Sequence, residues 1–231
     1  MNYPVIAVIV AAGKGRRMKS PVPKQYAILA GKPILSHTLS AFDAAPSIDA
    51  VVISADSEET FYRNLGKHGV IEKPLFVTRG GNERQDSVFN ALKMIEHCEI
   101  VVVHDGVRPL VTASVIEKSV KLARQYGASV SGMPSKDTIK EIDQNGFAAA
   151  TLDRSRLWSV QTPQAFRFDL LKEAHIKAEQ EAFLGTDDSS LVERLGHRVI
   201  LFEGGYDNIK ITTQEDMLFA EQILLGRGKN L

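Results

Sequence analysis

The chain has 231 residues, and its 28 lysine and arginine residues balance 28 aspartate and glutamate residues. A formal net charge of zero excludes a surface built throughout to bind nucleic acid or anionic lipid, and the single cysteine, Cys98, excludes a disulfide framework or a zinc site of several cysteines. No apolar run approaches the roughly 20 residues of a membrane-spanning helix, and no basic region precedes the apolar residues 3–12, so we expect a soluble, cytoplasmic, single-domain protein without nucleic-acid or membrane partners.

Short apolar runs rich in β-branched residues alternate along the chain with longer amphipathic stretches. The runs predict strands over residues 4–10, 50–54, 75–78, 100–103, 128–133 and 198–203. The stretches predict helices over residues 33–44, 57–67, 83–96, 113–126, 169–181, 187–195 and 214–225. Thr212 and Glu215 have the spacing of a capping box for the last helix.

This alternation determines the expected fold class. Nearly continuous apolar strands are covered on both faces, and strands that alternate with helices form right-handed crossovers. We therefore expect an α/β fold with a Rossmann-like, mainly parallel sheet and helices on both faces, within one domain over residues 1–231.

Residues 136–160 interrupt the alternation. Two short runs, 138–142 and 147–152, flank the sequence Asp143-Gln-Asn-Gly146, which is typical of a turn between antiparallel strands. A hairpin at this place would project from the sheet. It is either a decorated surface loop or an arm that packs on a second subunit, because an isolated hairpin is only marginally stable in water.

A glycine-rich loop follows the first predicted strand, at the end of the sheet where ligands bind in open α/β folds. Gly13 and Gly15 carry no Cβ and let the backbone approach a ligand closely. Five cations lie within eleven residues that contain no acid, namely Lys14, Arg16, Arg17, Lys19 and Lys24. Such a loop would hold a polyanion such as a triphosphate, and a solvated turn is the alternative interpretation.

Met18 separates this loop from two familiar phosphate-binding patterns. It stands at the second glycine of a Walker A loop and at the third glycine of a dinucleotide fingerprint, where its bulk obstructs the tight turn. A P-loop phosphotransferase is therefore disfavoured.

The loop and several later motifs resemble one enzyme family. The sequence Ala11-Ala-Gly-x-Gly-x-Arg-Met18, followed by Pro23-Lys-Gln25, is similar to the signature of the sugar-nucleotidyltransferase superfamily. The motifs that narrow the match are Gly80-Gly-Asn-Glu-Arg-Gln-Asp-Ser-Val88, His104-Asp-Gly-Val-Arg-Pro109, Lys136-Asp-Thr-Ile139, Gln161-Thr-Pro-Gln164, Thr186-Asp-Asp188 and Asp207-Asn-Ile-Lys210. Together they resemble the 2-C-methyl-D-erythritol 4-phosphate cytidylyltransferase family of the non-mevalonate isoprenoid pathway over residues 4–225. Val107 departs from the pattern, in which a smaller residue, often alanine, is usual.

The resemblance implies a reaction in which the phosphate of 2-C-methyl-D-erythritol 4-phosphate attacks the α-phosphorus of CTP, giving 4-CDP-2-C-methyl-D-erythritol and pyrophosphate. Because a phosphate monoester is already ionised near neutral pH, this chemistry needs positioning and charge stabilisation rather than a general base. Arg17 and Lys24 match the family's transition-state stabilisers. Asp105 matches an aspartate that faces the substrate and Mg²⁺, the implied divalent cofactor.

The resemblance also implies two sets of binding residues and a homodimer. The nucleotide-binding set is Ala11, Ala12, Gly13, Gly15, Gly81, Asn82, Arg84, Ser87 and Gly106. The substrate-binding set is Asp105, Arg108, Thr138, Arg154, Thr162 and Lys210. Arg154 follows the hairpin arm, which in the family crosses to the partner subunit, so each site would be completed by two chains.

Structural roles remain as alternatives for several of these residues. Asp105 and Arg108 form a plausible turn pair, and Ser87 is a plausible helix cap. Asp187 and Asp188 are expected to be helix N-caps only, without a catalytic role. His104 is expected to be a structural residue at a strand end and not a base.

Two alternative functions also stay open. A ribitol 5-phosphate cytidylyltransferase shares the first motif, although residues 136–140 and 186–190 favour methylerythritol phosphate as the acceptor. A module that binds CTP without turnover is the alternative from outside the enzymes.

Overall fold

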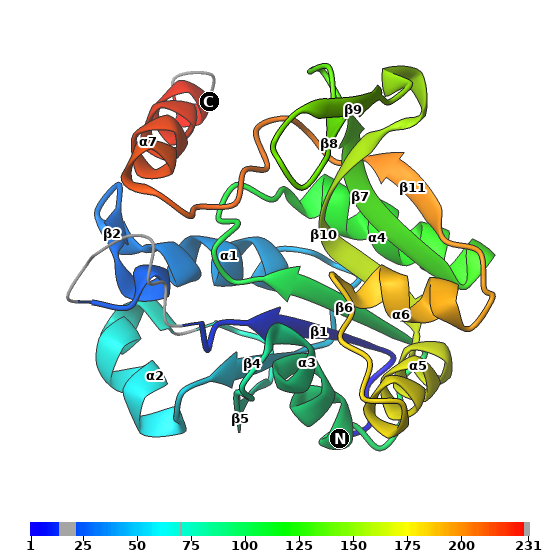
Figure 1. Ribbon diagram of the computed structural model, residues 1–231. Helices are drawn as coiled ribbons and strands as arrows, with labels where there is room; N and C mark the ends of the chain where they lie inside the picture. Colours follow the sequence, from blue (N-terminus) through cyan, green and yellow to red (C-terminus); the bar gives the residue numbers. More distant parts are fainter. Residues whose placement is uncertain (14–21, 70, 229–231) are drawn as a thin grey trace.

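The computed structural model describes residues 1–13, 22–69 and 71–228, and its frame is a seven-stranded sheet (Figure 1). In spatial order the strands are β11 (Ile200–Glu203), β7 (Ala128–Pro134), β10 (Trp158–Arg167), β6 (Ile100–Asp105), β1 (Val5–Val10), β4 (Ala50–Ala55) and β5 (Leu75–Arg79). Strand β10 is antiparallel to both of its neighbours, and the other adjacent pairs are parallel. The expected α/β fold with a mainly parallel sheet is confirmed.

Helices cover both faces of the sheet, because successive side chains of a strand point to opposite faces. The odd-numbered side chains of β1 lie in one apolar core with α1 (Ile34–Asp43), α2 (Glu58–Leu65) and α4 (Ala113–Tyr126). The even-numbered side chains Ile6 and Val8 lie in a second core with α3 (Arg84–Lys93), α5 (Phe168–Gln180) and α6 (Asp188–Arg194). The final helix, α7 (Gln214–Gly228), packs on a third and smaller core. No helix in the described residues is long and apolar enough to cross a membrane.

Shorter elements connect this frame. Strands β2 (Ile28–Leu29) and β3 (Lys32–Pro33) form a small two-stranded sheet before α1. The described residues also include the 3₁₀ turns η2 (Lys24–Tyr26), η3 (Gly66–Gly69) and η4 (Arg154–Arg156).

Strand β10 lies in the middle of the sheet, and the sequence pattern did not predict it. The strand contains Pro163, and a proline argues against a central strand because it has no N–H for the ladder. In the fold, the register of β10 against β7 shifts between Val160 and Gln164, so Pro163 stands where the regular pairing is interrupted. The strand thereby tolerates the proline.

The last helix begins with a different cap from the predicted one. The N–H groups of Thr212 and Thr213 donate to the carboxylate of Asp216 at 2.7 and 2.8 Å, and Asp216 N donates to Thr213 Oγ1 at 3.4 Å. The predicted pairing of Thr212 with Glu215 is therefore wrong by one residue. Two threonines and two acids are adjacent here, so the spacing rule fits either register.

The interruption at 136–160 is a hairpin arm that projects from the sheet, in yellow-green in Figure 1. Its strands β8 (Lys140–Ile142) and β9 (Ala148–Thr151) are antiparallel, as the turn sequence predicts. Asp143 Oδ1 accepts the N–H groups of Asn145 and Phe147 at 2.9 Å each and closes the turn. Even the large apolar side chains of the arm are mostly exposed: Ile142 is 68% exposed and Phe147 is 71% exposed.

Candidate active site

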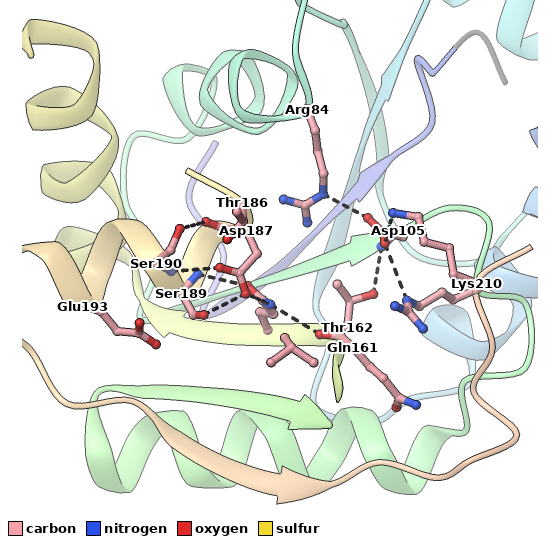
Figure 2. A pocket seen from close by; sticks show the side chains of 13 residues that line it. Arg84, Asp105, Gln161, Thr162, Thr186, Asp187, Ser189, Ser190, Glu193 and Lys210 are labelled. Carbon is pink, nitrogen blue, oxygen red and sulfur yellow. Dashed lines mark hydrogen bonds and ion pairs between the residues drawn. The ribbon is translucent and has the colours of Figure 1, made fainter. Parts of the chain in front are cut away.

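Two adjoining cavities lie at the carboxyl ends of the central strands, where ligands bind in open α/β sheets. The first, which we call the loop cavity, has a volume of about 530 Å³ and is lined by residues that follow β1 and β5. The second, which we call the α6 cavity, has a volume of about 410 Å³ and lies between β10 and α6 (Figure 2). Arg84, Asp105 and Lys210 line both cavities and so mark their junction.

Asp105, the last residue of β6, contacts three cations at this junction (Figure 2). Its carboxylate lies 3.0 Å from Arg84 Nε, 2.8 Å from Lys210 Nζ and 3.5 Å from Arg108 Nε. Burial by itself would raise the pKa of Asp105, but Arg84, Lys210 and Arg108 outweigh it and hold this pKa well below its usual range. The expected pair of Asp105 with Arg108 is therefore present, but it is one part of a network that also includes Arg84 and Lys210.

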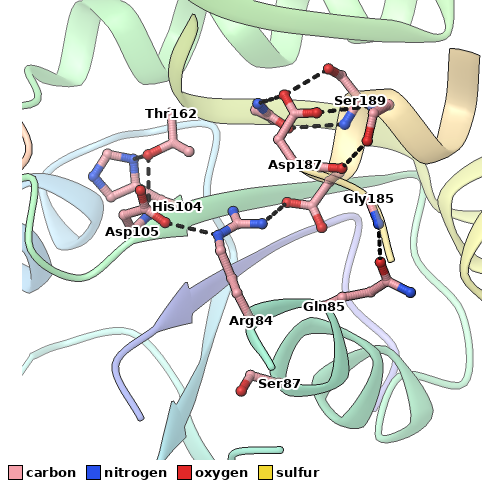
Figure 3. Close-up of polar contacts among 12 residues, drawn as sticks. Arg84, Gln85, Ser87, His104, Asp105, Thr162, Gly185, Asp187 and Ser189 are labelled. Atoms are coloured by element: carbon pink, nitrogen blue, oxygen red, sulfur yellow. Dashed lines mark hydrogen bonds and ion pairs between the residues drawn. The ribbon is translucent and has the colours of Figure 1, made fainter. Parts of the chain in front are cut away.

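Arg84 bridges two buried carboxylates. Its guanidinium reaches Asp105 on one side (Figure 3) and Asp188 Oδ2 on the other, through Nη1 at 2.7 Å. Burial would lower the pKa of Arg84, but Asp188 and Asp105 raise it, so the side chain stays charged. Its Nη2 atom is buried without a hydrogen-bond partner in the described protein. This unused donor suits an anionic ligand.

The expectation that Asp188 is only a helix N-cap is wrong. The preceding Asp187 is the helix cap, as expected, and accepts the N–H of Ser190 at 3.0 Å. Asp188 instead turns inward, with a side chain only 1% exposed, and lies between Arg84 and the buried His175, whose Nε2 is 3.4 Å away. The pair of adjacent acids at the start of α6 was a signal in the sequence. One acid suffices as the N-cap, so the second was available for another contact.

Replacing Asp188 by asparagine is expected to destabilise the fold. The change keeps the shape of the side chain but leaves the buried Arg84 with one carboxylate partner, at a cost of roughly 1–3 kcal/mol in the free energy of unfolding. Urea unfolding at pH 7 measures it. Glu179→Gln, which removes the exposed pair with Lys93, is the control and should change stability by less than about 1 kcal/mol. Equal effects of the two substitutions would contradict the buried bridge.

His104 is held in one neutral form at the end of β6. The N–H of Asp105 donates to Thr162 Oγ1 at 3.1 Å, and this hydroxyl lies 3.0 Å from His104 Nδ1. Because His104 Nε2 faces a carbonyl, which only accepts, the neutral ring carries its proton on Nε2, and the Thr162 hydroxyl donates to Nδ1. His104 Nε2 then donates to the carbonyl of Arg108 at 3.2 Å. Burial lowers the pKa of His104 to about 3, so the ring is a structural residue, as expected, and also positions Thr162 beside Asp105.

The loop cavity is formed by two backbone turns that pack against each other. A Cβ on Gly80 would meet Ala12 Cβ at 2.1 Å, and a Cβ on Gly81 would meet Asp86 Cβ at 2.1 Å, so both positions require glycine. Ser87 Oγ accepts the N–H of Gly81 at 3.0 Å. The interpretation of Ser87 as the cap of α3 is therefore wrong, because the cap is the reciprocal pair of Glu83 and Asp86.

The predicted nucleotide-binding residues divide into three groups. Those that line the loop cavity are Ala11, Ala12, Gly13, Gly81, Asn82, Arg84 and Ser87. Gly106 lines neither cavity. Its N–H donates to Val10 O at 2.9 Å and so supports Val10, which lines the loop cavity. Gly15 lies outside the described residues, as does the catalytic candidate Arg17.

Lys24 opens η2 and lines the loop cavity. Its Nζ donates to the carbonyl of Ile211 at 3.2 Å. The next residue, Gln25, is buried and donates through Nε2 to Ala11 O at 2.6 Å, which ties this turn to the end of β1. Val107 also lines the cavity and is buried against the third core. Its side chain is larger than the alanine usual in the family pattern and narrows the cavity. Its backbone stays fixed, because its carbonyl accepts the N–H of Ile211 at 2.9 Å.

The predicted substrate-binding residues are only partly brought together. Asp105, Arg108, Thr162 and Lys210 line the α6 cavity. Thr138 and Arg154 lie exposed on the hairpin arm and line neither cavity, and Arg154 Nη1 donates to the carbonyl of Lys136 at 2.8 Å. Within one chain, these two residues are therefore not part of the site.

Comparisons with known proteins agree on one family. The family model described as IspD, 2-C-methyl-D-erythritol 4-phosphate cytidylyltransferase, matches residues 5–226. The protein of that name from Caldanaerobacter subterraneus subsp. tengcongensis is 48% identical over 223 residues, which are 95% of this chain and 98% of that protein. The one from Bacillus velezensis is 47% identical over 232 residues, with 100% and 99% covered.

The fold comparison points the same way. The crystal structure of 4-diphosphocytidyl-2C-methyl-D-erythritol synthase from Anaerococcus prevotii superimposes with a TM-score of 0.83 at 33% identity, and the match covers 96% of both chains. With a family model that spans nearly all of the sequence and relatives near one half identity, this chain belongs to the 2-C-methyl-D-erythritol 4-phosphate cytidylyltransferase family.

Proposed function

We propose that this chain transfers the cytidylyl group of CTP to 2-C-methyl-D-erythritol 4-phosphate and releases pyrophosphate, in isoprenoid precursor biosynthesis. The observation that carries this proposal is the convergence of Lys24, Arg84, Arg108 and Lys210 on two adjoining cavities. These cations match a reaction in which two phosphate-bearing substrates must meet. We place this reaction in the cytoplasm, as expected from the sequence.

The chemistry requires little beyond positioning. A phosphate oxygen of the acceptor attacks the α-phosphorus of CTP in line, a new P–O bond forms, and the bond to the β-phosphate oxygen breaks, so that pyrophosphate leaves with the electron pair. The acceptor phosphate has its second pKa near 6 and is already an anion at neutral pH. No general base is needed, which is consistent with the low pKa of His104.

Each cavity suits one substrate. The loop cavity would hold CTP, with its triphosphate on the backbone of Ala12 and Gly13 and its base against Gly81 and Asn82. The α6 cavity would hold the alcohol phosphate near Thr162. The reacting atoms then meet at the junction, where fixed cations stabilise the charge that develops on the phosphoryl oxygens.

Mg²⁺ is the proposed cofactor, and the donor set fits it. The described residues contain no group of three or more His, Cys, Asp or Glu side chains that could hold a metal alone. Mg²⁺, however, is usually bound through one or two carboxylates together with substrate phosphates. Asp105, the carboxylate that lines both cavities, would hold the ion together with the triphosphate. When bound, the ion supplies neutralisation of phosphate charge.

The direct test is pyrophosphate release from CTP with methylerythritol phosphate, with ribitol 5-phosphate, or with neither. We expect release with methylerythritol phosphate alone, and none when Mg²⁺ is removed by a chelator. Release with ribitol 5-phosphate instead would keep the mechanism and overturn the substrate. No release with either acceptor would leave a CTP-binding module.

A homodimer is part of the proposal, and the arm is its proposed contact. Residues Ile142 and Phe147 expose apolar surface at the end of the arm that this chain does not cover. Arg154 and Thr138 lie at the base of the arm, away from both cavities of their own chain. An arm that packs on a second copy would bury the apolar pair and carry Arg154 to the partner's acceptor phosphate.

Phe147→Asp is therefore expected to convert the dimer into monomers at micromolar concentration and to raise KM for the acceptor more than KM for CTP. A charge in a buried apolar contact is strongly unfavourable, and the monomer lacks the partner's Arg154. Sedimentation and steady-state kinetics measure the two effects. Ile176→Asp on α5, where Ile176 is 39% exposed, is the control. A Phe147→Asp protein that stays dimeric would contradict the arm contact.

A further inference from the structure

The residues between β11 and α7, numbers 204–213, form neither helix nor strand, and we call them the strap. In Figure 1 the strap is the orange connection that runs across the end of the sheet between β11 and α7. It carries Lys210, whose Nζ lies 2.8 Å from Asp105. The Lys210 side chain is long and 38% exposed, so its ammonium keeps one position only if its backbone is fixed. The anchoring of the strap therefore determines where this cation lies.

One polar residue of the strap is buried as deeply as the protein core. Asn208 is 1% exposed, and its Nδ2 donates to the carbonyl of Thr162 at 2.8 Å and to Gln161 Oε1 at 3.2 Å, both on β10. The orientation of the amide is fixed by its neighbours, because a carbonyl only accepts and Gln161 uses its own Nε2 to donate to Gly205 O at 2.9 Å. The backbone carbonyl of Asn208 accepts from Arg108 Nη1 at 2.8 Å.

The strap is anchored on both sides of Lys210. On the far side, Ile211 N donates to Val107 O at 2.9 Å, and this bond does not involve Asn208. On the near side, the buried amide of Asn208 is the bond to β10 nearest in sequence to Lys210, and Gln161 of β10 holds Gly205 three residues earlier. At the outer end, Asp207 pairs with Arg227 of α7, but these side chains are 46% and 34% exposed, and Arg227 also donates to Leu110 O at 2.9 Å.

We infer that Asn208 is a positioning residue, which does not touch substrate and acts through Lys210. Its amide fixes the distance between the strap and β10, and thereby holds the ammonium of Lys210 against Asp105 at the junction of the two cavities. The inference rests on the proposed cytidylyl transfer, and it adds a second residue of the Asp207-Asn-Ile-Lys210 motif to the machinery.

Asn208→Ala and the isosteric Asn208→Asp are expected to lower kcat by about 10- to 100-fold, because a displacement of roughly 1 Å at a reacting group has this effect. The dissociation constant of CTP, measured by calorimetry, should rise by less than about tenfold, since Lys210 is one of several groups that line the loop cavity and neither Asn208 nor its β10 partners line it. Asp207→Ala, one residue earlier on the strap, is the matched control and should keep kcat within about threefold.

A double-mutant cycle separates positioning from a structural effect. If Asn208 acts through Lys210, the protein with both Asn208→Ala and Lys210→Ala should have the kcat of Lys210→Ala alone, within about threefold. Losses that multiply would overturn the inference, as would an unchanged kcat in both Asn208 variants. If Asn208→Ala fails to fold, Asn208→Asp carries the same cycle. The wild-type acceptor assay, run in parallel, tests the proposed function separately, and the cycle is read with whichever acceptor reacts.

Discussion

Lys24→Ala is expected to lower kcat by roughly 10²- to 10³-fold, the loss that follows removal of one preorganised donor to a transition-state oxyanion. Lys24 lines the loop cavity from η2, and the bond from Gln25 to Ala11 O fixes the backbone beside it. In the proposed complex, the ammonium would face the triphosphate from a fixed backbone. Affinity for CTP should fall by less than about tenfold, because the backbone groups of both loops remain.

Two measurements and two further variants decide the role of Lys24. Single-turnover rates report the chemical step, and calorimetry reports CTP binding. Lys32→Ala on β3 is the control, since Lys32 is exposed and lines neither cavity. Lys24→Arg should recover only part of the rate, because a planar guanidinium does not replace a point charge. Full turnover in Lys24→Ala would remove the lysine from the mechanism, and an equal loss of kcat and of CTP affinity would make it a binding residue.

The frame of this fold could be predicted from the sequence because its strands are covered on both faces. Residues 100–103 of β6 are continuously apolar for that reason, and all six residues of the strand, 100–105, are buried. The pattern failed at β10, where Gln161, Thr162 and Pro163 interrupt the apolar run. Gln161 and Thr162 line the α6 cavity and anchor the strap, so residues of the site broke the apolar pattern by which the strand could have been recognised.

The candidate site could be predicted as motifs but not as contacts. The motif residues Arg84 and Asp105 were recognisable, yet the bridge from Arg84 to Asp188 joins residues 104 positions apart. The anchor from Asn208 to Thr162 spans 46 positions. No local periodicity or spacing encodes such pairs, and only the wound sheet brings them together. Thr138 and Arg154 show the opposite case, since the sequence assigns them to the site and one folded chain keeps them apart from it.

Asp105→Ala is expected to have the largest effect on stability. The substitution leaves Arg84, Arg108 and Lys210 facing one another without the carboxylate they share. Breaking a buried ion pair costs about 3–5 kcal/mol, and the lower end applies here because the 38% exposed Lys210 can turn into solvent. Glu72→Ala, at an exposed acid, is the control and should be nearly neutral.

The pH dependence of this effect follows from the pKa of Asp105, which the three cations hold below its usual range. A depressed pKa stabilises the fold at every pH above the unfolded value of about 3.9, and this contribution is lost as the pH falls below it. The difference in unfolding free energy between the wild type and Asp105→Ala should therefore be constant from pH 7 to pH 5 and narrow below about pH 4. A difference that stays constant down to about pH 3 would contradict the cation network.

Bound CTP should compensate for part of this loss, because phosphate oxygens can take the place of the missing carboxylate beside Arg84 and Lys210. Saturating CTP is therefore expected to raise Tm more in Asp105→Ala than in the wild type, while turnover falls because the acceptor and Mg²⁺ lose their carboxylate. If CTP stabilises both proteins equally, the triphosphate does not reach these cations. The two substrates would then have to meet at a place other than the junction of the two cavities.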